Sequence, residues 1–300
     1  MQDIKFDRQA ICIQCHNKPE LINSLLNNMP EKYFDFYIHV DKKSNIEEKI
    51  CKQGNVYFCE RLNVKWGRFS QVEATLKMFN LIDGKKYSYV HLISGNDYLI
   101  KSISYIKDFF SSDNQNQYIQ SEKLPENSTW SWQGMDRFMV WYPQWLIQRP
   151  SKKIRRFIRI IYREFVMRTV VFRRKNQPVS NFFGGSQWFS ITGECMEWMK
   201  TFLHEHPKYV NFFKHSVCCD EVFFATLIRY SPYQDKIMNE NLRFMVWNDR
   251  VTGGPKELEK KDVDTMVGSK CVWARKIVTL EVVNLIQEKL SRIENTKESV

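Results

Sequence analysis

The chain has 300 residues, which is enough for one large α/β domain or for two modest ones. A hydrophobic fraction of 43% and a charged fraction of 26% are ordinary for a folded protein, and they exclude a disordered, collagen-like or low-complexity chain. Of the net charge of +11, residues 152–175 contribute +9, because they hold ten basic residues and one acid. The remainder is nearly neutral, which argues against a nucleic-acid-binding protein that is basic throughout.

Short apolar runs alternate with segments of helical periodicity over the first third of the chain. We predict strands at 10–15, 33–40, 56–58 and 87–93. We also predict three helices: one that begins near Pro19, one over 70–82 and one over 103–110. Alternation of strands and helices at this spacing predicts a parallel, doubly wound central sheet. Ligands of such sheets bind beyond the carboxyl ends of the strands. Here these ends are 15–17, 41–43 and 94–97.

The middle of the chain, 115–180, is predicted to be an insertion. Its first part, up to residue 150, is weakly periodic and rich in tryptophan, so we expect an irregular wall against which an acceptor binds. In the basic segment 152–175, apolar residues recur with helical spacing, and Lys and Arg side chains occupy the other face. Such a helix can lie on an anionic membrane surface. The alternative is a helix packed on the domain with its basic face in solvent.

Alternation of strands and helices resumes after Pro178. The pattern predicts a turn and a strand over 184–192, helices over 194–205 and 220–230, a strand over 242–247, and helices over 262–267 and 280–293. No internal repeat is present. We therefore expect residues 1–300 to form a single domain with one insertion.

The eight cysteines are expected to be reduced structural thiols. Cys12 and Cys15 have C-x-x-C spacing, but they lie in an apolar run typical of a buried strand, and no second pair follows at the spacing of a zinc site. Reduced thiols favour a reducing compartment. The first twenty residues contain no apolar run of the signal-peptide kind, and nowhere do about 18 apolar residues follow one another. We therefore expect a cytoplasmic protein without a membrane-spanning helix.

Several carboxylates are placed where they could do chemistry. Asp220 and Glu221 precede an apolar helix, and acids at this position complement the helix dipole. Two cysteines come directly before them, so a carboxylate here lies beside buried surface, where a general base could be held and its pKa adjusted. Asp41 ends a strand and could accept hydrogen bonds from a ribose or a base; a polar turn is the alternative. Asp97 ends another strand, where many nucleotide-sugar enzymes place a metal-binding D-x-D motif.

A divalent metal site is not expected. Only one carboxylate is present at 94–97, and the D-x-D at 262–264 opens a predicted helix, so capping is its better interpretation. A departing diphosphate would then need fixed cations, for which Lys256, Arg275 and Lys276 are candidates; ordinary surface charge is the alternative. The chain contains no G-x-x-x-x-G-K-[ST], G-x-G-x-x-G or G-x-S-x-G motif, which excludes the simplest P-loop, Rossmann and hydrolase interpretations.

Eight stretches of the chain occur together in the order found in one family. They are 15–19 (CHNKP), 36–44 (FYIHVDKKS), 66–75 (WGRFSQVEAT), 91–102 (HLISGNDYLIKS), 185–192 (GSQWFSIT), 220–227 (DEVFFATL), 243–247 (RFMVW) and 273–277 (WARKI). Each is weakly specific alone, but together they span most of the chain. On these residues the chain resembles the core-2/I-branching glycosyltransferases (family 14), which include β-1,6-N-acetylglucosaminyltransferases and peptide O-xylosyltransferases.

The resemblance implies a GT-A-type fold, an inverting mechanism and a UDP-sugar donor, with no divalent metal or other cofactor. It also implies a role for each matching residue. The implied roles are Glu221 as the catalytic base; Arg275, Lys276 and, with altered spacing, Lys256 at the diphosphate; His16 and Asp41 at the nucleotide; and Asp97, Asp220 and Trp247 in the donor and acceptor pocket.

The chain departs from the animal members of the family, for which a membrane anchor and luminal disulfides are implied. With the basic helix, this favours a bacterial-type enzyme at the cytoplasmic face of the plasma membrane, acting in synthesis of a surface polysaccharide or a lipid-linked glycan. We expect transfer of N-acetylglucosamine from a UDP-sugar to a glycan hydroxyl; UDP-xylose or another donor is the nearer alternative. The alternative of another class is a non-catalytic protein that binds membranes or nucleic acid through 152–175. An enzyme of this family is not expected to bind nucleic acid.

Overall fold

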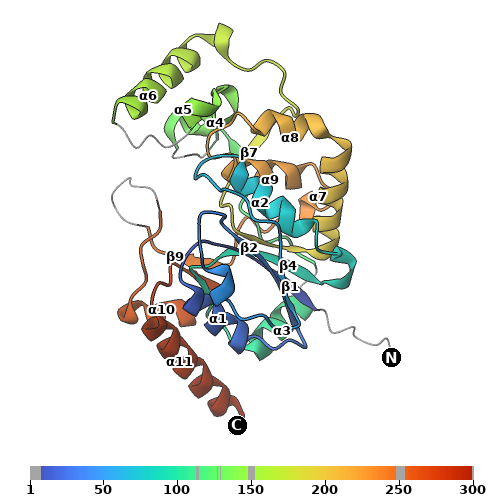
Figure 1. Ribbon diagram of the computed structural model, residues 1–300. Coiled ribbons are helices and arrows are strands. Elements are labelled where there is room, and N and C mark those ends of the chain that lie inside the picture. Colours follow the sequence, from blue (N-terminus) through green and yellow to red (C-terminus); the bar gives the residue numbers. More distant parts are fainter. Residues whose placement is uncertain are drawn as a thin grey trace.

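A five-stranded sheet forms the centre of the protein (Figure 1). The computed structural model describes residues 8–112, 115–126, 128, 130–147, 153–247 and 254–298. The strands are β1 (Gln9–Cys15), β2 (Phe34–Val40), β3 (Val56–Phe58), β4 (Tyr89–Ser94) and β8 (Phe189–Thr192), in the order β3-β2-β1-β4-β8. β1, β2, β3 and β4 run parallel, and β8 pairs antiparallel to β4. The prediction of a mostly parallel sheet is therefore confirmed.

Strands β1, β2 and β4 send alternate side chains to two separate hydrophobic cores. Ile11 and Ile13 lie in one core, whereas Ala10 and Cys12 lie in the other. The first core is covered by α1 (Pro19–Asn28), α3 (Ile103–Ser112), α10 (Val263–Gly268) and α11 (Leu280–Glu298). The second is covered by α2 (Ser70–Phe79), α7 (Gly193–Glu205), α8 (Pro207–Phe213) and α9 (Asp220–Arg229). Helices on both faces make the fold a doubly wound α/β structure, as predicted.

A second, three-stranded sheet continues from the carboxyl end of β4. It contains β5 (Asp97–Leu99), β10 (Trp273–Arg275) and β9 (Arg243–Met245), with β10 in the centre. β10 runs antiparallel to β5 and parallel to β9. The predicted strand end at 94–97 is confirmed, but the chain turns there into β5. The small sheet therefore brings the C-terminal part of the chain to the carboxyl edge of the central sheet.

A two-stranded sheet of β6 (Glu122–Leu124) and β7 (Phe182–Gly184) encloses most of the segment predicted to be an insertion, 115–180. Between these strands lie α4 (Asp136–Met139), α5 (Gln144–Ile147) and α6 (Lys153–Arg168). They share a small core of their own, made of Val140, Tyr142, Leu146, Val166 and Met167. The three helices lie at the end of the molecule opposite α11 (Figure 1). The predicted basic helix is thus present, although residues 148–152 lie outside the described part.

Short 3₁₀ helices complete the described structure. They are η1 (Glu47–Lys49), η2 (Gly84–Lys86), η3 (Ser131–Gly134), η4 (Val170–Phe172), η5 (Gln234–Lys236) and η6 (Lys260–Asp262). Several predicted helices have other bounds: the helix predicted over 70–82 ends at Phe79, the one over 103–110 reaches Ser112, and the one over 280–293 reaches Glu298. All eight cysteines are free. Within the described ranges, no helix is both long and apolar enough to cross a bilayer.

Candidate functional site

The carboxyl ends of β1 and β2 bring His16 and Asp41 to one edge of the sheet. The Asp41 backbone N–H donates to the Cys15 carbonyl oxygen at 2.9 Å, which ties the two strand ends together. His16 is exposed, whereas Asp41 is buried to 9% exposure. The Asp41 carboxylate accepts a hydrogen bond from the Lys43 backbone N–H at 2.9 Å and lies 3.2 Å from the Lys43 ammonium. The structure thus brings the two predicted nucleotide-binding residues together; their role stays a prediction.

Asp97 and Arg275 face each other across the small sheet, in register on β5 and β10. Arg275 Nη1 lies 2.7 Å from Asp97 Oδ1, and it also donates to the Ser94 hydroxyl. The Ser94 hydroxyl and backbone N–H donate to Asp97 at 2.8 Å and 3.0 Å. The Asp97 side chain has 0% exposure, and that of Arg275 has 15%. In this structure, therefore, the Asp97 carboxylate does not face a pocket as predicted from the sequence; it holds Arg275 in place.

The indole of Trp188 supports the same arginine from another side. The guanidinium carbon of Arg275 lies 4.6 Å from the centre of the Trp188 ring, within the range of a cation–π contact. Trp188 precedes β8, so it is carried by a different strand of the central sheet from Ser94. Three contacts from separate elements therefore fix the position of one cation at the sheet edge.

Lys256 and Lys276 lie on neighbouring backbone segments beside Arg275. The Lys276 backbone N–H donates to the Lys256 carbonyl oxygen at 3.3 Å, and the Leu258 N–H donates to the Lys276 carbonyl oxygen at 2.8 Å. Burial and the nearby Arg275 charge lower the pKa of Lys276. Lys256 Nζ lies 3.5 Å from Asp262 Oδ2. The structure thus brings the backbones of the three predicted diphosphate-binding residues together, with Lys256 paired to Asp262, Arg275 paired to Asp97, and the charge of Arg275 acting on Lys276.

Trp247 lies near these cations on the exposed side. Its backbone forms an isolated bridge with Pro255, and the Lys256 N–H donates to the Val246 carbonyl oxygen at 2.7 Å. The Trp247 side chain is 64% exposed. An exposed indole offers a flat apolar surface to a ligand. The predicted contact with an acceptor sugar stays a prediction.

The two acids at the start of α9 differ sharply in their surroundings. Asp220 is buried at 8% exposure, its Oδ1 has no hydrogen-bond partner, and burial raises the pKa of its carboxyl to about 6. Glu221 is partly exposed and forms an ion pair with Arg137 of α4. The Arg137 guanidinium carbon stacks 3.4 Å from the centre of the Trp130 ring. The insertion therefore fixes the carboxylate predicted to be the base.

A short glycine-led segment, 185–188, connects the Glu221 side of the site with the Arg275 side. The Gly185 N–H donates to the Glu221 carbonyl oxygen at 2.9 Å, and Trp188 lies under Arg275. Three Cα–Cα steps separate Gly185 from Trp188, so these two backbone positions lie at most about 11 Å apart. A Cβ at Gly185 would lie 2.1 Å from the Gln120 carbonyl oxygen, so the close approach of these backbones requires glycine.

Three glutamines hold this segment against the central sheet. Gln187 Nε2 donates to Gln14 Oε1 of β1 at 3.1 Å, and Gln71 Nε2 of α2 donates to Gln187 Oε1 at 3.0 Å. Gln71 also accepts the Gly67 N–H at 2.9 Å. Because Gln187 is buried, satisfying its amide on both sides fixes the segment. Sequence reasoning assigned no role to these glutamines, although Gln71 and Gln187 fall within two of the eight matched stretches.

Arg137 was also missed, and here the sequence carries no signal. It lies in the weakly periodic part of the insertion, and no pattern near it indicates which residue it contacts. The contact with Glu221 joins residues 84 positions apart in the chain. Only the folded arrangement of α4 against α9 reveals the pair.

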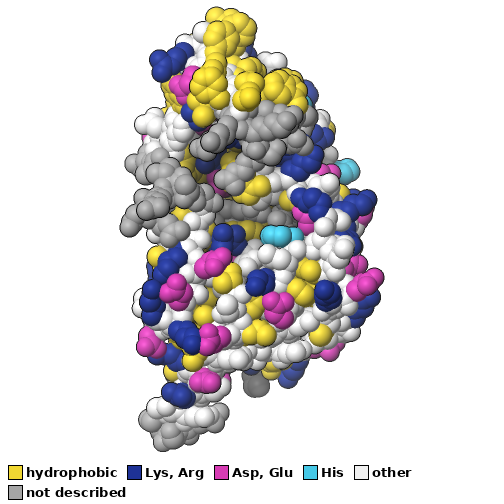
Figure 2. Space-filling model, turned by 60° about the vertical axis from the view of Figure 1, so that its left-hand side comes forward, with side chains coloured by type: hydrophobic (Ala, Val, Ile, Leu, Met, Phe, Trp, Pro, Cys, Tyr) yellow, Lys and Arg dark blue, Asp and Glu magenta, His cyan; other side chains and the backbone are white. Residues whose placement is uncertain are grey.

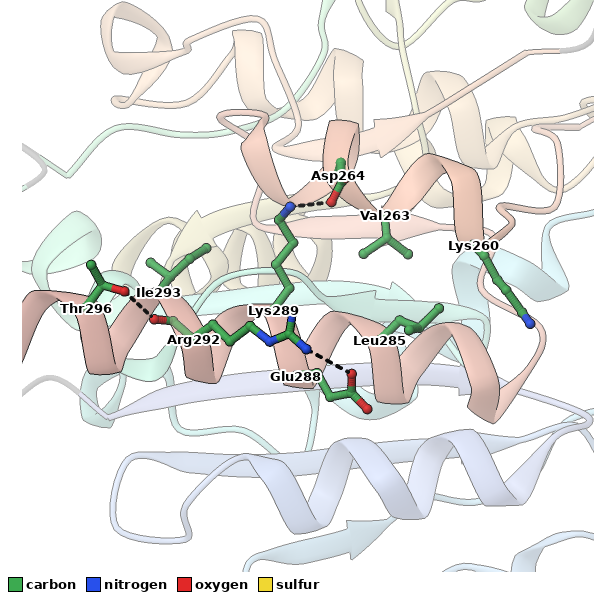
Figure 3. A pocket seen from close by; sticks show the side chains of 9 residues that line it. All are labelled: Lys260, Val263, Asp264, Leu285, Glu288, Lys289, Arg292, Ile293 and Thr296. Atoms are coloured by element: carbon green, nitrogen blue, oxygen red, sulfur yellow. Dashed lines mark hydrogen bonds and ion pairs between the residues drawn. The ribbon is translucent and has the colours of Figure 1, made fainter.

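The D-x-D at 262–264 takes part in local structure. Asp262 forms a capping box with Glu259 at η6, as predicted, and Asp264 pairs with Lys289 of α11. Asp264 and Lys289 line a cavity of about 450 Å³ between α10 and α11, where Arg292 lies 3.9 Å from Glu288 (Figure 3). No predicted site residue lines it; of its charged residues, Asp264 pairs with Lys289, Glu288 with Arg292, and Lys260 with Glu281 outside the lining. Within the described ranges no group of three or more His, Cys, Asp or Glu residues could hold a metal ion.

Comparison with known proteins gives one family. The family model described as Core-2/I-Branching enzyme matches residues 16–267. Xylosyltransferase 1 of Canis lupus familiaris is 24% identical over 72% of this chain and 22% of its own length. Xylosyltransferase 2 of Canis lupus familiaris is 24% identical over 74% of this chain and 24% of its own length. Xylosyltransferase 2 of Bos taurus is 22% identical over 81% of this chain and 26% of its own length. The chain thus spans about a quarter of the length of these curated relatives.

A solved structure from Bacillus anthracis, described as a glucose-1-phosphate thymidylyltransferase in complex with a sucrose, is also similar. It covers 64% of this chain and 74% of its own, with 11% identity and a TM-score of 0.28. A TM-score of that size is too low for a comparison of individual elements.

Proposed function

The chain belongs to the core-2/I-branching enzyme family, and we propose that it is an inverting glycosyltransferase that uses a UDP-sugar without a divalent metal. One observation carries the proposal: the backbones of Lys256, Arg275 and Lys276 adjoin one another at the carboxyl edge of the sheet, and segment 185–188 connects this place to the backbone of Glu221, whose carboxylate is partly exposed. Ligands of doubly wound sheets bind at this edge. The arrangement matches the two needs of the reaction, a stabilised leaving group and a base.

The proposed reaction is a single displacement. The Glu221 carboxylate removes the proton of an acceptor hydroxyl as that oxygen attacks C1 of the donor sugar. The new C1–O bond forms as the bond between C1 and the diphosphate oxygen breaks, so the electron pair leaves with UDP. Attack on the face opposite the leaving group inverts the configuration at C1. The proton remains on Glu221 until it is released to solvent.

Negative charge grows on the leaving diphosphate, and the cation group is proposed to stabilise it there. Lys256, Arg275 and Lys276 come from two connected backbone segments whose positions are fixed before a ligand binds. Preorganised charges of this kind act without further reorganisation during the reaction. Arg275, held by Asp97 and Trp188, is the most fixed of the three. His16 and Asp41, at the neighbouring strand ends, are proposed to contact the nucleotide.

Donor and acceptor are proposed at the level of class. N-acetylglucosamine is the first candidate for the transferred sugar, and xylose is the second because the similar curated proteins are named xylosyltransferases. The acceptor is proposed to be a hydroxyl of a glycan or lipid-linked glycan, placed between Asp220, Glu221 and the exposed Trp247. We propose a location at the cytoplasmic face of the membrane, with nucleic acid excluded as a partner.

Replacement of the proposed base tests the mechanism. A panel of UDP-sugars first identifies the donor, since a ligand that binds the native state raises its melting temperature. Glu221→Gln is then expected to lower transfer roughly 10²–10⁴-fold while the melting shift with UDP is unchanged. Glu194→Gln is the matched control, because Glu194 lies exposed in the first turn of α7. Equal turnover by Glu221→Gln and the control would remove Glu221 from this role.

A further inference from the structure

Helix α6 turns its apolar side away from the protein. Four of its large apolar side chains are more than half exposed: Ile154 at 70%, Phe157 at 63%, and Ile161 and Phe165 each at 51%. They recur at the three- and four-residue spacing of one helix face. An amphipathic helix of a globular domain ordinarily packs such a face on the core. The longer apolar row of α6 therefore does not pack on the domain.

Specific contacts hold the opposite face of α6 against the insertion. Val166 and Met167 are buried in the small core, and the Tyr162 hydroxyl donates to the Trp141 carbonyl oxygen at 2.8 Å. Arg163 lies 3.5 Å from Asp136 of α4. These contacts involve residues spaced three and four apart, so they define one face. The outward direction of the apolar side is thus set by the packing.

The exposed apolar surface continues past the end of α6 into η4. Val170, Val171 and Phe172 are 66%, 74% and 59% exposed, and the Phe172 ring lies 5.2 Å from that of Phe165. We call this continuous surface the apolar ridge; it consists of Ile154, Phe157, Ile158, Ile161, Phe165, Val170, Val171 and Phe172. Hydrophobic side chains gather at this end of the molecule (Figure 2). Contiguous apolar surface of this kind marks an interaction site.

The positive charge of the segment that carries the apolar ridge favours an anionic partner. Residues 152–175 carry +9, and their single acid, Glu164, is engaged by Trp132 Nε1 and Arg163 at 2.9 Å each. Arg168 is 74% exposed at the end of the helix. A second copy of the chain would bring two such positive segments together, whereas an anionic lipid surface complements both the charge and the apolar side chains.

We propose that the apolar ridge inserts into the interfacial region of a bilayer containing anionic lipid, with the exposed Arg168 at the headgroups. Asp136, which Arg163 contacts, directly precedes Arg137, the partner of Glu221. Helix α4 therefore contacts both α6, which carries the apolar ridge, and Glu221, the proposed base. A membrane bound at the apolar ridge brings the insertion, and with it Glu221, close to lipid-linked acceptors. This second step rests on the proposed function; the membrane contact itself does not.

Vesicle sedimentation without any sugar nucleotide tests the contact. The full chain is expected to sediment with vesicles of phosphatidylcholine and phosphatidylglycerol, less with phosphatidylcholine alone, and less as salt increases. Phe157→Ser with Phe165→Ser is expected to weaken anionic-vesicle binding about tenfold or more, since binding scales with buried apolar area. Leu81→Ser is the control, because Leu81 is 48% exposed but lies outside the ridge.

Three results would overturn the proposal: no binding of the unaltered chain to anionic vesicles, equal binding by the double variant, or a dimer in solution that the double variant abolishes. Melting temperatures of all variants show that they are folded. Activity on a water-soluble acceptor separates this proposal from the catalytic one. The double variant is expected to keep that activity, and Glu221→Gln is expected to bind vesicles normally.

Discussion

The two sides of the candidate site are built in different ways. On the cation side, Arg275 is held by Asp97, Ser94 and Trp188, all carried by strands or strand ends of the two sheets. On the base side, Glu221 is held by Arg137, which stacks on Trp130 within the insertion. The side proposed to hold the leaving group thus belongs to the framework of the fold, and the side proposed to hold the acceptor belongs to the segment that differs most from a regular α/β pattern. Under the proposed function, change in the insertion alters the acceptor without disturbing the diphosphate.

The largest expected effect is on stability, at the centre of the cation side. Asp97→Asn leaves Arg275 without its charged partner, and breaking a buried pair in this way costs about 3–5 kcal/mol. Urea unfolding measures the change. Asp83→Asn, which alters an exposed pair with Lys86, is the control and is expected to have little effect. A small loss of unfolding free energy for Asp97→Asn would show that the Asp97–Arg275 pair does not hold the cation side in place.

The next largest expected effect is on catalysis, and it distinguishes the role of the cation group from the role of the base. Lys276→Ala is expected to lower kcat about 10²–10³-fold, as loss of one preorganised stabilising charge does. It should also weaken UDP binding, which Glu221→Gln should not. Steady-state kinetics and UDP titration measure both quantities. Lys270→Ala, at an exposed lysine paired with Glu240, is the control. Unchanged kcat in Lys276→Ala would place the diphosphate away from this residue.

The smallest expected effect concerns Asp220 on the base side. Burial raises the pKa of this carboxyl from 3.8 to about 6, so as pH rises the unfolded chain releases the proton first. The stability of the native state therefore falls between about pH 4 and pH 6, by up to about 3 kcal/mol. Asp220→Asn lacks this loss. The stability difference between variant and unaltered chain is expected to grow over that interval and then level off.

Melting curves across pH 4–8 measure this difference, with Asp235→Asn, at an exposed aspartate, as the control. A difference that stays constant with pH would show that the Asp220 carboxyl is not destabilised by its surroundings. The base side would then resemble the cation side, in which charges are satisfied.

Much of the cation side could be predicted because its framework is periodic. Apolar runs predicted β1, β2 and β4, and parallel pairing placed His16, Asp41 and Asp97 at one edge. The pairing of Asp97 with Arg275 could not be predicted. It depends on β5 and β10, which have three residues each, too few to show a period, and which join positions 178 apart.

The base side and the apolar ridge were harder to predict. Nothing near Arg137 in the sequence indicates that it meets Glu221, since tertiary packing alone brings α4 to α9. For α6, helical spacing correctly predicted the helix and its two faces. Spacing does not tell which face meets the protein. Val166 and Met167, which anchor it, lie on the side opposite the longer apolar row.

A crystal structure with UDP, grown in the presence of EDTA, tests the central claim most directly. We predict that the β-phosphate lies within about 3 Å of Lys276 and Arg275 nitrogen atoms, and that Glu221 faces the space beyond it where the sugar would lie. A diphosphate bound elsewhere, UDP that binds only when a divalent cation is restored, or a Glu221 carboxylate directed away from that space would contradict the claim.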